Sequence, residues 1–138
     1  MSSPDFRNDR DIVWAHFRTR KGGHPIRVAG IHLPAFYTSN PKNKAEYDRQ
    51  IRKLAEWVKG GKNRVVAGDF NGSKGGARMK PIEAVARLSA AVRSGPSGQK
   101  IDYVGVRRGG RWKVVKTVRG KKFRSDHASV LVTLEWVG

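Results

Sequence analysis

Short apolar runs, each bounded by glycine or proline, dominate the first half of the sequence. Residues 11–18 (DIVWAHFR) and 26–33 (IRVAGIHL) are rich in β-branched and aromatic side chains, and residues 21–24 (KGGH) lie between them. This pattern predicts a β-hairpin with a loose turn. Residues 64–68 (RVVAG) form a short and almost continuous apolar run, which is typical of a buried central strand.

The segment between the second and the third of these runs has apolar residues at helical spacing. Asn40 can cap a helix that has Pro41 in its first turn, and Gly60-Gly61 would end it. Between these signals, apolar side chains recur at helical spacing at Tyr47, Ile51, Leu54, Ala55 and Val58. We therefore expect a helix here, and a β-α-β unit that it forms with the two flanking strands.

The second half of the chain alternates in the same way. Residues 101–106 and 112–118 resemble strands, and residues 107–111 (RRGGR) predict a hairpin turn between them. Alternating apolar positions predict a final strand near residues 130–136. A second helix, with Pro81 near its start, is expected from the spacing of Ile82, Val85, Ala86 and Leu88.

Length and composition favour one α/β domain over residues 1–138. The chain has no internal repeat and no interdomain linker. It has no cysteine, which excludes disulfides and thiolate metal sites. It also has no apolar run long enough to span a membrane, and its first residues lack the apolar stretch of a secretory signal, so we expect a cytoplasmic protein.

The net charge of +18, from 29 Lys and Arg against 11 Asp and Glu, predicts a polyanionic partner. Nucleic acid is the leading class, and DNA is favoured over RNA. An anionic membrane surface is the alternative. We expect no membrane partner, because no helical segment is basic on one face and strongly apolar on the other.

Four short polar motifs lie where the predicted strands end. They are HL at 32–33, GDFN at 68–71, IDYV at 101–104 and SDH at 125–127. Each has a structural interpretation when taken alone: Asp69 and Asn71 are common turn residues, and His32 could be a packed core histidine. Together and in this order, the motifs resemble those of the endonuclease/exonuclease/phosphatase superfamily, which includes DNase I.

This resemblance implies a four-layer α/β sandwich of two mixed sheets and Mg²⁺-dependent hydrolysis of phosphate esters. It further implies that Asp69 orients or deprotonates the attacking water, that Asn71 binds a nonbridging phosphate oxygen, and that His127 contacts the scissile phosphate. Asp126 would bind metal or orient a histidine, Asp102 would support the site, and His32 is a candidate general acid. We expect Mg²⁺, or Mn²⁺, at Asp69, Asn71 and Asp126, since hard oxygen ligands suit these ions.

Basic loops are expected to flank this site and to bind DNA phosphates. Their residues are Lys74, Arg78, Arg107, Arg108, Arg111, Lys121, Lys122 and Arg124.

The resemblance covers only the C-terminal half of the family pattern. The missing half normally supplies an Asn and a Glu that binds metal, and nothing before His32 matches either. Position alone suggests Asn8 for the amide and, for the carboxylate, Asp5, Asp9 or Asp11.

Half of a two-sheet sandwich implies one mixed sheet with two helices and one uncovered apolar face. Trp14, Phe17 and Trp136 would then be exposed unless they find a partner, so we expect a homodimer that rebuilds the four layers. A smaller single-sheet α/β fold, whose face is covered by its two helices, remains the alternative.

Three functional hypotheses follow. The first is a metal-dependent endonuclease that hydrolyses DNA with low sequence specificity, since Lys and Arg would bind phosphates rather than read bases. The second is a catalytically weak or inactive, basic nucleic-acid-binding protein derived from such a nuclease, which the missing Glu favours. The third, a phosphatase acting on lipid or inositol phosphates, fits the charge of +18 less well.

Overall fold

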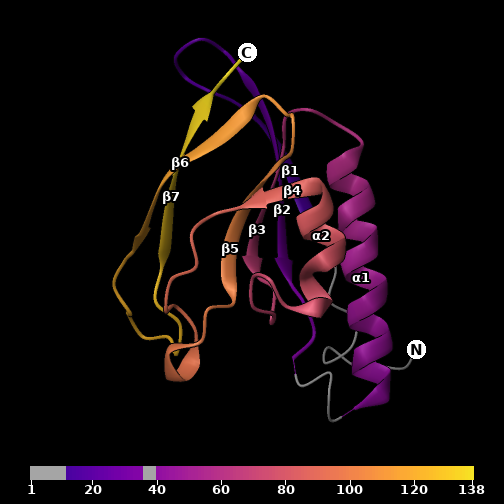
Figure 1. The fold of residues 1–138 in the computed structure, drawn as a ribbon. Helices are drawn as coiled ribbons and strands as arrows, with labels where there is room; N and C mark the ends of the chain where they lie inside the picture. The colour runs from indigo at the N-terminus through magenta and orange to yellow at the C-terminus, as the bar shows by residue number, and fades with distance from the viewer. Residues whose placement is uncertain (1–11, 36–39) are drawn as a thin grey trace, which may run out of the picture.

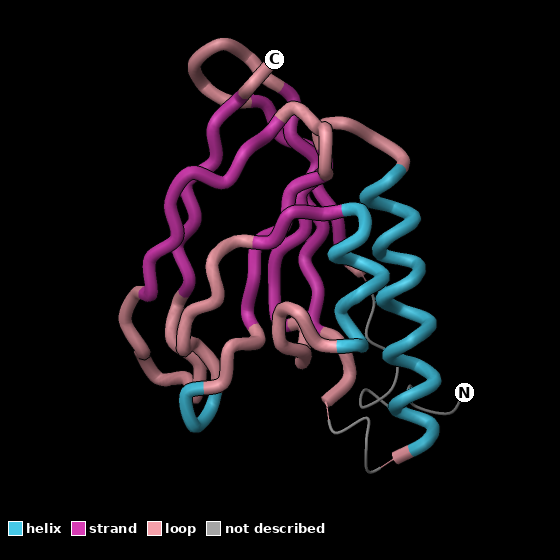
Figure 2. Tube along the Cα trace, viewed as in Figure 1, coloured by secondary structure: helices cyan, strands magenta, loops and turns pink. Residues whose placement is uncertain are grey.

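The computed structural model describes residues 12–35 and 40–138, and the backbone there forms two sheets and two α-helices (Figure 1). The candidates Asp5, Asn8, Asp9 and Asp11 lie outside the described residues. Figure 2 shows the two α-helices together on one side of the strands. In chain order the elements are β1 (Val13–Arg18), β2 (Pro25–His32), α1 (Pro41–Lys59), β3 (Arg64–Asp69), α2 (Lys80–Val85), β4 (Ala86–Leu88), β5 (Asp102–Arg107), β6 (Trp112–Arg119) and β7 (Val130–Trp136), with 3₁₀ turns at Ala77–Met79 and Pro96–Gly98.

The larger sheet is mixed and has five strands in the order β1-β2-β3-β5-β4. β1 and β2 pair antiparallel, which confirms the predicted hairpin. β2 and β3 pair in parallel and α1 connects them, which confirms the β-α-β unit. β5 is antiparallel to both β3 and β4. The expected α/β class, with one mixed sheet and two helices, is therefore confirmed.

One face of this sheet is covered by α1 and α2. The predicted start of α1 is confirmed, because the Asn40 side chain accepts a hydrogen bond from the Lys42 N–H at 3.0 Å and Pro41 occupies the first turn. The buried stripe of α1 meets inward side chains of β2, β3 and β5. The main members of this core are Ala29, Ile31, Tyr47, Ile51, Leu54, Val58, Val66, Phe70, Ile82 and Tyr103.

The opposite face of the large sheet packs against a second, two-stranded sheet formed by β6 and β7. Trp112 is the centre of this contact: it is 7% exposed, and its indole N–H donates to the Pro25 carbonyl at 3.1 Å. Trp136 packs edge-to-face on Trp112, with ring centroids 5.2 Å apart, and stacks on His24. Trp136 therefore finds its partner inside the chain. The expectation that one apolar face of the sheet is uncovered is wrong, because β6 and β7 pack on that face.

The expectation of a hairpin between β5 and β6 is wrong, because β6 belongs to this second sheet. β5 pairs with β3 and β4, whereas β6 pairs with β7, so residues 107–111 form a corner between two sheets rather than a hairpin turn. Two strands joined by a short turn can enter different sheets when each has a better partner elsewhere, and the local sequence carries no signal of that choice.

The second helix is shorter than expected. α2 ends at Val85, and Ala86–Leu88 forms β4, which pairs with β5 from Arg107 to Gly105. Apolar side chains at Ile82, Val85, Ala86 and Leu88 match helical spacing, but Ala86 and Leu88 also match the period of a strand. Pairing with the edge of β5 decides between these two conformations.

β1 is an edge strand with a large exposed apolar surface. Its exposed side chains include Val13 (70%), Trp14 (60%) and Phe17 (53%). In the antiparallel pairing, Trp14 lies opposite Ala29 on the helix face, whereas Phe17 lies opposite Ile26 on the β6–β7 face. The expectation that Trp14 and Phe17 are exposed in a single chain is thus confirmed. No helix within the described residues is long and apolar enough to cross a membrane.

The helix-face core predicts a specific loss of stability. Leu54 is fully buried against the sheet, so Leu54→Ala is expected to lower the free energy of unfolding by about 2–5 kcal/mol through lost burial and a residual cavity. The measurement is urea denaturation followed by circular dichroism. The exposed neighbour Lys53 provides the control, and Lys53→Ala is expected to change stability by about 0.5 kcal/mol or less. Equal effects of the two variants would contradict this packing.

Candidate active site

Three adjacent strands place three polar side chains in one row across the large sheet. His32 is level with Asp69 in the β2–β3 pairing, and Asp69 is level with Asp102 in the β3–β5 pairing. Residues that are level in neighbouring strands project from the same face. Val28, Val65 and Val104, at even spacing from these three residues, pack in the cluster with β6 and β7. The row therefore lies on the β6–β7 face, at its end.

A close backbone approach shapes β3 directly before Asp69. Gly68 has φ +144°, and a Cβ at this position would overlap the carbonyl oxygen of Ile31 in the neighbouring strand. Only glycine suits this combination of dihedral angle and contact. The glycine of the GDFN motif is thus required by the close pairing of β2 with β3.

The rest of this motif forms a tight turn. Asn71 has φ 43°, its N–H donates to Asp69 Oδ1 at 2.7 Å, and its side-chain amide donates to the Leu33 carbonyl at 2.7 Å. The turn interpretation of Asp69 and Asn71 is therefore correct. This turn holds both side chains at the end of the sheet, because the hydrogen bond from Asn71 to Leu33 ties the segment after β3 to the segment after β2.

The loop between β6 and β7 brings His127 over this row. Its Nδ1–H donates to Asp102 Oδ2 at 2.9 Å, and its Nε2 lies 3.7 Å from Asp69 Oδ2. His32 Nε2 lies 3.5 Å from the same Asp69 oxygen. The Ser125 hydroxyl accepts the N–H of His127 at 3.0 Å, which fixes the loop locally. The structure thus joins two imidazoles and two carboxylates from four separate segments.

Ser94 is a further member of this network that the sequence did not reveal. It is 2% exposed, and its hydroxyl donates to Asp102 Oδ2 at 2.7 Å. Its carbonyl accepts the N–H of Ala128, next to His127, at 2.7 Å. Ser94 lies in a turn-rich segment where serine is unremarkable, so no sequence signal separated it from an ordinary turn residue.

Three of these four residues, His32, Asp69 and His127, line a cavity of about 730 Å³ at the end of the sheet. Its walls come from the segments that follow β2 and β3, from the segment before β5 and from the β6–β7 loop. The lining residues include His32, Asp69, Asn71, Arg78, Ser97, Gln99, Ser125, Asp126 and His127. This cavity is large enough for a phosphate group with part of its substituents.

The environment of Asp69 raises the pKa of its carboxyl above the usual value. Burial is the largest cause, and the nearby Asp102 carboxylate adds to it. The hydrogen bond from the Asn71 N–H opposes this shift, as do the two imidazoles. A raised pKa makes a carboxylate a better proton acceptor near neutral pH.

The pKa of His127 is also raised above its usual value. Burial acts in the lowering direction, but the hydrogen bond to Asp102 and the negative charges of Asp102, Asp69 and Asp126 outweigh it. Donation from Nδ1–H to Asp102 also selects the tautomer and directs Nε2 into the cavity.

The donor set suits a hard divalent cation. Among the described residues, Asp69, Asp102 and His127 form a group whose potential ligand atoms all lie within 4.8 Å of one another. Asp69 lines the cavity, whereas Asp102 Oδ2 accepts hydrogen bonds from Ser94 and His127. Asp126 is exposed and lines the same cavity outside this group. The ligand set Asp69, Asn71 and Asp126 stays a prediction.

The basic residues that were expected to flank the site lie in two regions of the fold, and five of them belong to segments that carry site residues. Arg78 lines the cavity and donates to the Asn71 carbonyl at 2.8 Å, and Lys74 lies in the loop that follows Asn71. Lys121, Lys122 and Arg124 belong to the β6–β7 loop that carries His127.

Arg107, Arg108 and Arg111 do not flank the cavity, and that part of the expectation is wrong. β5 begins beside Asp69 and ends at Arg107, roughly 17 Å along the strand, because it runs antiparallel to β3. In Figure 1 this corner lies near the top, whereas the Asp69 end of β3 points down. The Arg107 and Arg108 side chains donate there to the carbonyls of Lys59 and Glu83.

Comparison of the sequence with protein-family models and with curated proteins finds no match. The fold does match solved structures. The human Nocturnin catalytic domain, solved with a bound sulfate anion, has a TM-score of 0.71 at 15% identity, covering 93% of this chain and 53% of that one. A Bacteroides thetaiotaomicron endonuclease/exonuclease/phosphatase family protein has a TM-score of 0.57 at 20% identity, covering 91% and 56%. A Staphylococcus aureus beta toxin variant with bound magnesium ions has a TM-score of 0.60 at 13% identity, covering 88% and 56%.

These matches define the class of fold. The chain has part of the DNase I-like fold of the endonuclease/exonuclease/phosphatase proteins, which confirms the resemblance seen in the four motifs at the level of the fold. It spans little more than half the length of these matched structures.

The Asp102–His127 contact predicts a pH effect. In metal-free buffer with chelator, Asp102→Asn is expected to lower the pKa of His127, because it removes the charge that favours the imidazolium. The measurement is an NMR titration of the imidazole. Because the folded-state pKa is raised above 6.5, this contact stabilises the fold fully at lower pH and loses that effect as pH rises through the raised pKa.

Asp126→Asn provides the matched control. Asp126 makes the smallest of the named contributions to His127, so its neutralisation is expected to lower the pKa of His127 less than Asp102→Asn does. An unchanged His127 titration in Asp102→Asn would show that the contact is not formed in solution.

Proposed function

We propose that this protein is a metal-dependent phosphodiesterase that hydrolyses the DNA backbone with low sequence specificity. One observation carries this proposal: a half-buried carboxylate, Asp69, lies between two imidazoles at the base of an open cavity, and one of the imidazoles is oriented by a second carboxylate. Hydrolysis of a phosphodiester needs an oriented water, stabilisation of charge on the phosphoryl oxygens and a proton for the leaving oxygen. The cluster contains groups suited to each requirement.

His127 is proposed to bind the scissile phosphate through Nε2. Asp102 keeps Nδ1 protonated and raises the pKa of the ring, so an imidazolium is favoured beside an anionic substrate. The Ser94 hydroxyl donates to the same oxygen of Asp102, Oδ2, and helps to hold this carboxylate in place. The ring therefore needs little reorganisation when substrate binds.

Asp69 is proposed to orient and deprotonate the attacking water, which its raised pKa favours. His32 is 57% exposed at the opposite side of Asp69, where it can donate a proton to the leaving oxygen. Asn71 lines the same cavity and is proposed to bind a nonbridging oxygen.

Mg²⁺ or Mn²⁺, when bound, would stabilise negative charge on the phosphoryl oxygens. Asp69 would hold it, with Asn71 and Asp126 as further oxygen ligands from the same cavity wall. The magnesium ions bound in the matched beta toxin support this choice of metal.

DNA is proposed as the substrate because of the charge of the chain. A net charge of +18 on 138 residues favours a long polyanion, since each neutralised phosphate releases counterions. Phosphate contacts carry no base information, so the expected specificity is low. RNA is the less favoured polyanion.

The proposal predicts nicking of supercoiled plasmid in Mg²⁺ or Mn²⁺ and none in EDTA. Asp69→Ala and His127→Ala are each expected to reduce the rate by about 100-fold or more, because each removes a group in contact with the reacting atoms. Asp48→Ala, an α1 carboxylate paired with Lys44 away from the cavity, is the matched control and should nick normally. Equal nicking by all four proteins would refute the assignment.

A second candidate is a basic nucleic-acid-binding protein with little or no catalytic activity. It is favoured by the absence of any glutamate among the described residues that line the cavity, since the resemblance implies a Glu as a metal ligand. This candidate predicts salt-sensitive DNA binding that survives Asp69→Ala, with no nicking in any metal.

Self-association is also proposed, because the chain spans little more than half of the matched folds and leaves β1 exposed at the edge of the sheet. A second copy at this edge could cover Val13 and Phe17 on the β6–β7 face and Trp14 on the helix face.

Light scattering at micromolar concentration is expected to give the mass of a dimer. Trp14→Lys and Phe17→Lys should shift that mass towards the monomer, because each places a charge in the proposed contact. Val115→Lys, an exposed β6 position, is the control. A monomeric mass for the unaltered chain would count against self-association.

A further inference from the structure

A second cavity lies directly beside the proposed active site. Its volume is about 450 Å³, and it shares Ser97 and Asp126 with the larger cavity. Three cationic side chains line it: Arg93 from the β4–β5 connection, Arg119 at the end of β6, and Lys122 from the β6–β7 loop. Of these, only Lys122 was expected from the sequence to contact nucleic acid.

The two arginines of this cavity are connected to each other. The Arg119 side chain donates from Nε to the Arg93 carbonyl at 2.6 Å, which fixes the start of its guanidinium group against the β4–β5 connection. The Arg93 side chain extends over the 3₁₀ turn: a Cβ placed on Gly98 would lie 3.4 Å from its terminal nitrogen Nη1. Both guanidinium groups therefore lie at the same wall.

This wall is continuous with the catalytic cluster. Ser94, next to Arg93 in the chain, also lines the second cavity, and its hydroxyl holds Asp102. A ligand group in the second cavity thus lies one side chain away from the Asp102–His127 pair. Among the described residues that line this cavity, three are cationic and one, Asp126, is a carboxylate, so the charge of the lining favours an anionic ligand.

We infer that the Arg93–Arg119–Lys122 cavity binds a backbone phosphate of the nucleic-acid strand next to the phosphate that is cleaved. This inference rests on the proposed function, and it names the contact that holds the strand. Guanidinium groups bind phosphate oxygens through charge-assisted hydrogen bonds, and two neighbouring cavities with a shared wall suit two successive phosphates of one strand. The arginines of the 107–111 corner cannot serve this purpose, because they lie at the other end of the sheet.

The test is fluorescence anisotropy with a short labelled single-stranded DNA, measured at several salt concentrations in EDTA so that no cleavage occurs. Arg93→Gln and Arg119→Gln are each expected to weaken binding by about tenfold at low salt. Each should also reduce the magnitude of the slope of log K against log [salt] by about 0.7, the value for one lost phosphate contact on a single strand.

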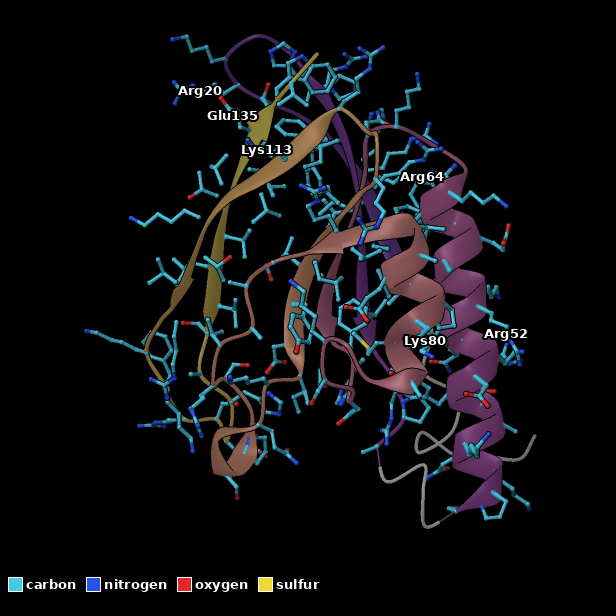
Figure 3. The ribbon with its side chains drawn as sticks, viewed as in Figure 1. Arg20, Arg52, Arg64, Lys80, Lys113 and Glu135 are labelled. Carbon is cyan, nitrogen blue, oxygen red and sulfur yellow. The ribbon has the colours of Figure 1, made fainter. Side chains whose placement is uncertain are left out.

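Two matched variants separate this contact from a general loss of charge or of structure. Arg52→Gln removes one positive charge from the outer surface of α1, away from β6 and β7 (Figure 3), and should leave the slope nearly unchanged. Arg119→Lys keeps the charge and should keep the salt slope. Thermal unfolding of each variant confirms that it is folded.

The outcomes distinguish failure of the proposed phosphate subsite from failure of the proposed function. If the unaltered chain binds DNA with a salt dependence but Arg93→Gln and Arg119→Gln bind equally well, or no worse than Arg52→Gln, the subsite is wrong and nucleic-acid binding stands. If the unaltered chain shows no salt-dependent binding, the proposed function fails and the subsite fails with it.

Discussion

The register of three central strands is the constraint on which the site depends. His32, Asp69 and Asp102 are level in β2, β3 and β5, and a slip of one residue in either pairing would move a side chain to the helix face. Gly68 permits this arrangement, because any side chain there would collide with the Ile31 carbonyl. The burial of Val66, Phe70 and Tyr103 against the helices gives the same register an energetic basis, since these side chains must face α1 and α2.

The two faces of the large sheet have different roles. The helix face supplies most of the hydrophobic core and holds the strands in register. The opposite face is covered by β6 and β7, and their connecting loop carries His127 to Asp102. The tryptophan contacts at Trp112 and Trp136 therefore act on the site at a distance, because they position the sheet from which this loop extends. Sites built from segments on two packed layers are held more rigidly than sites on one loop.

Electrostatics connect this geometry to the chemistry. The carboxylates of Asp69 and Asp102 lie close together, which is unfavourable unless cations balance them. His127, whose raised pKa favours the imidazolium, lies next to both carboxylates, and His32 contacts Asp69. The chain as a whole carries a net charge of +18, which favours a polyanionic partner in spite of this small acidic centre.

The sequence by itself determined the type and order of most elements, because period, capping and turn residues are local signals: the β1–β2 hairpin, α1 and the strand before Asp69 follow from them. It also pointed to His32, Asp69, Asn71, Asp102 and His127, as members of four motifs in a particular order. The tertiary structure alone decided that β5 and β6 enter different sheets, that Ala86–Leu88 is a strand, and that Ser94 supports Asp102. It also moved the Arg107 corner away from the site and placed Arg93 and Arg119 beside it. These features depend on which distant segments pair and pack, and a chain carries no local record of its long-range partners.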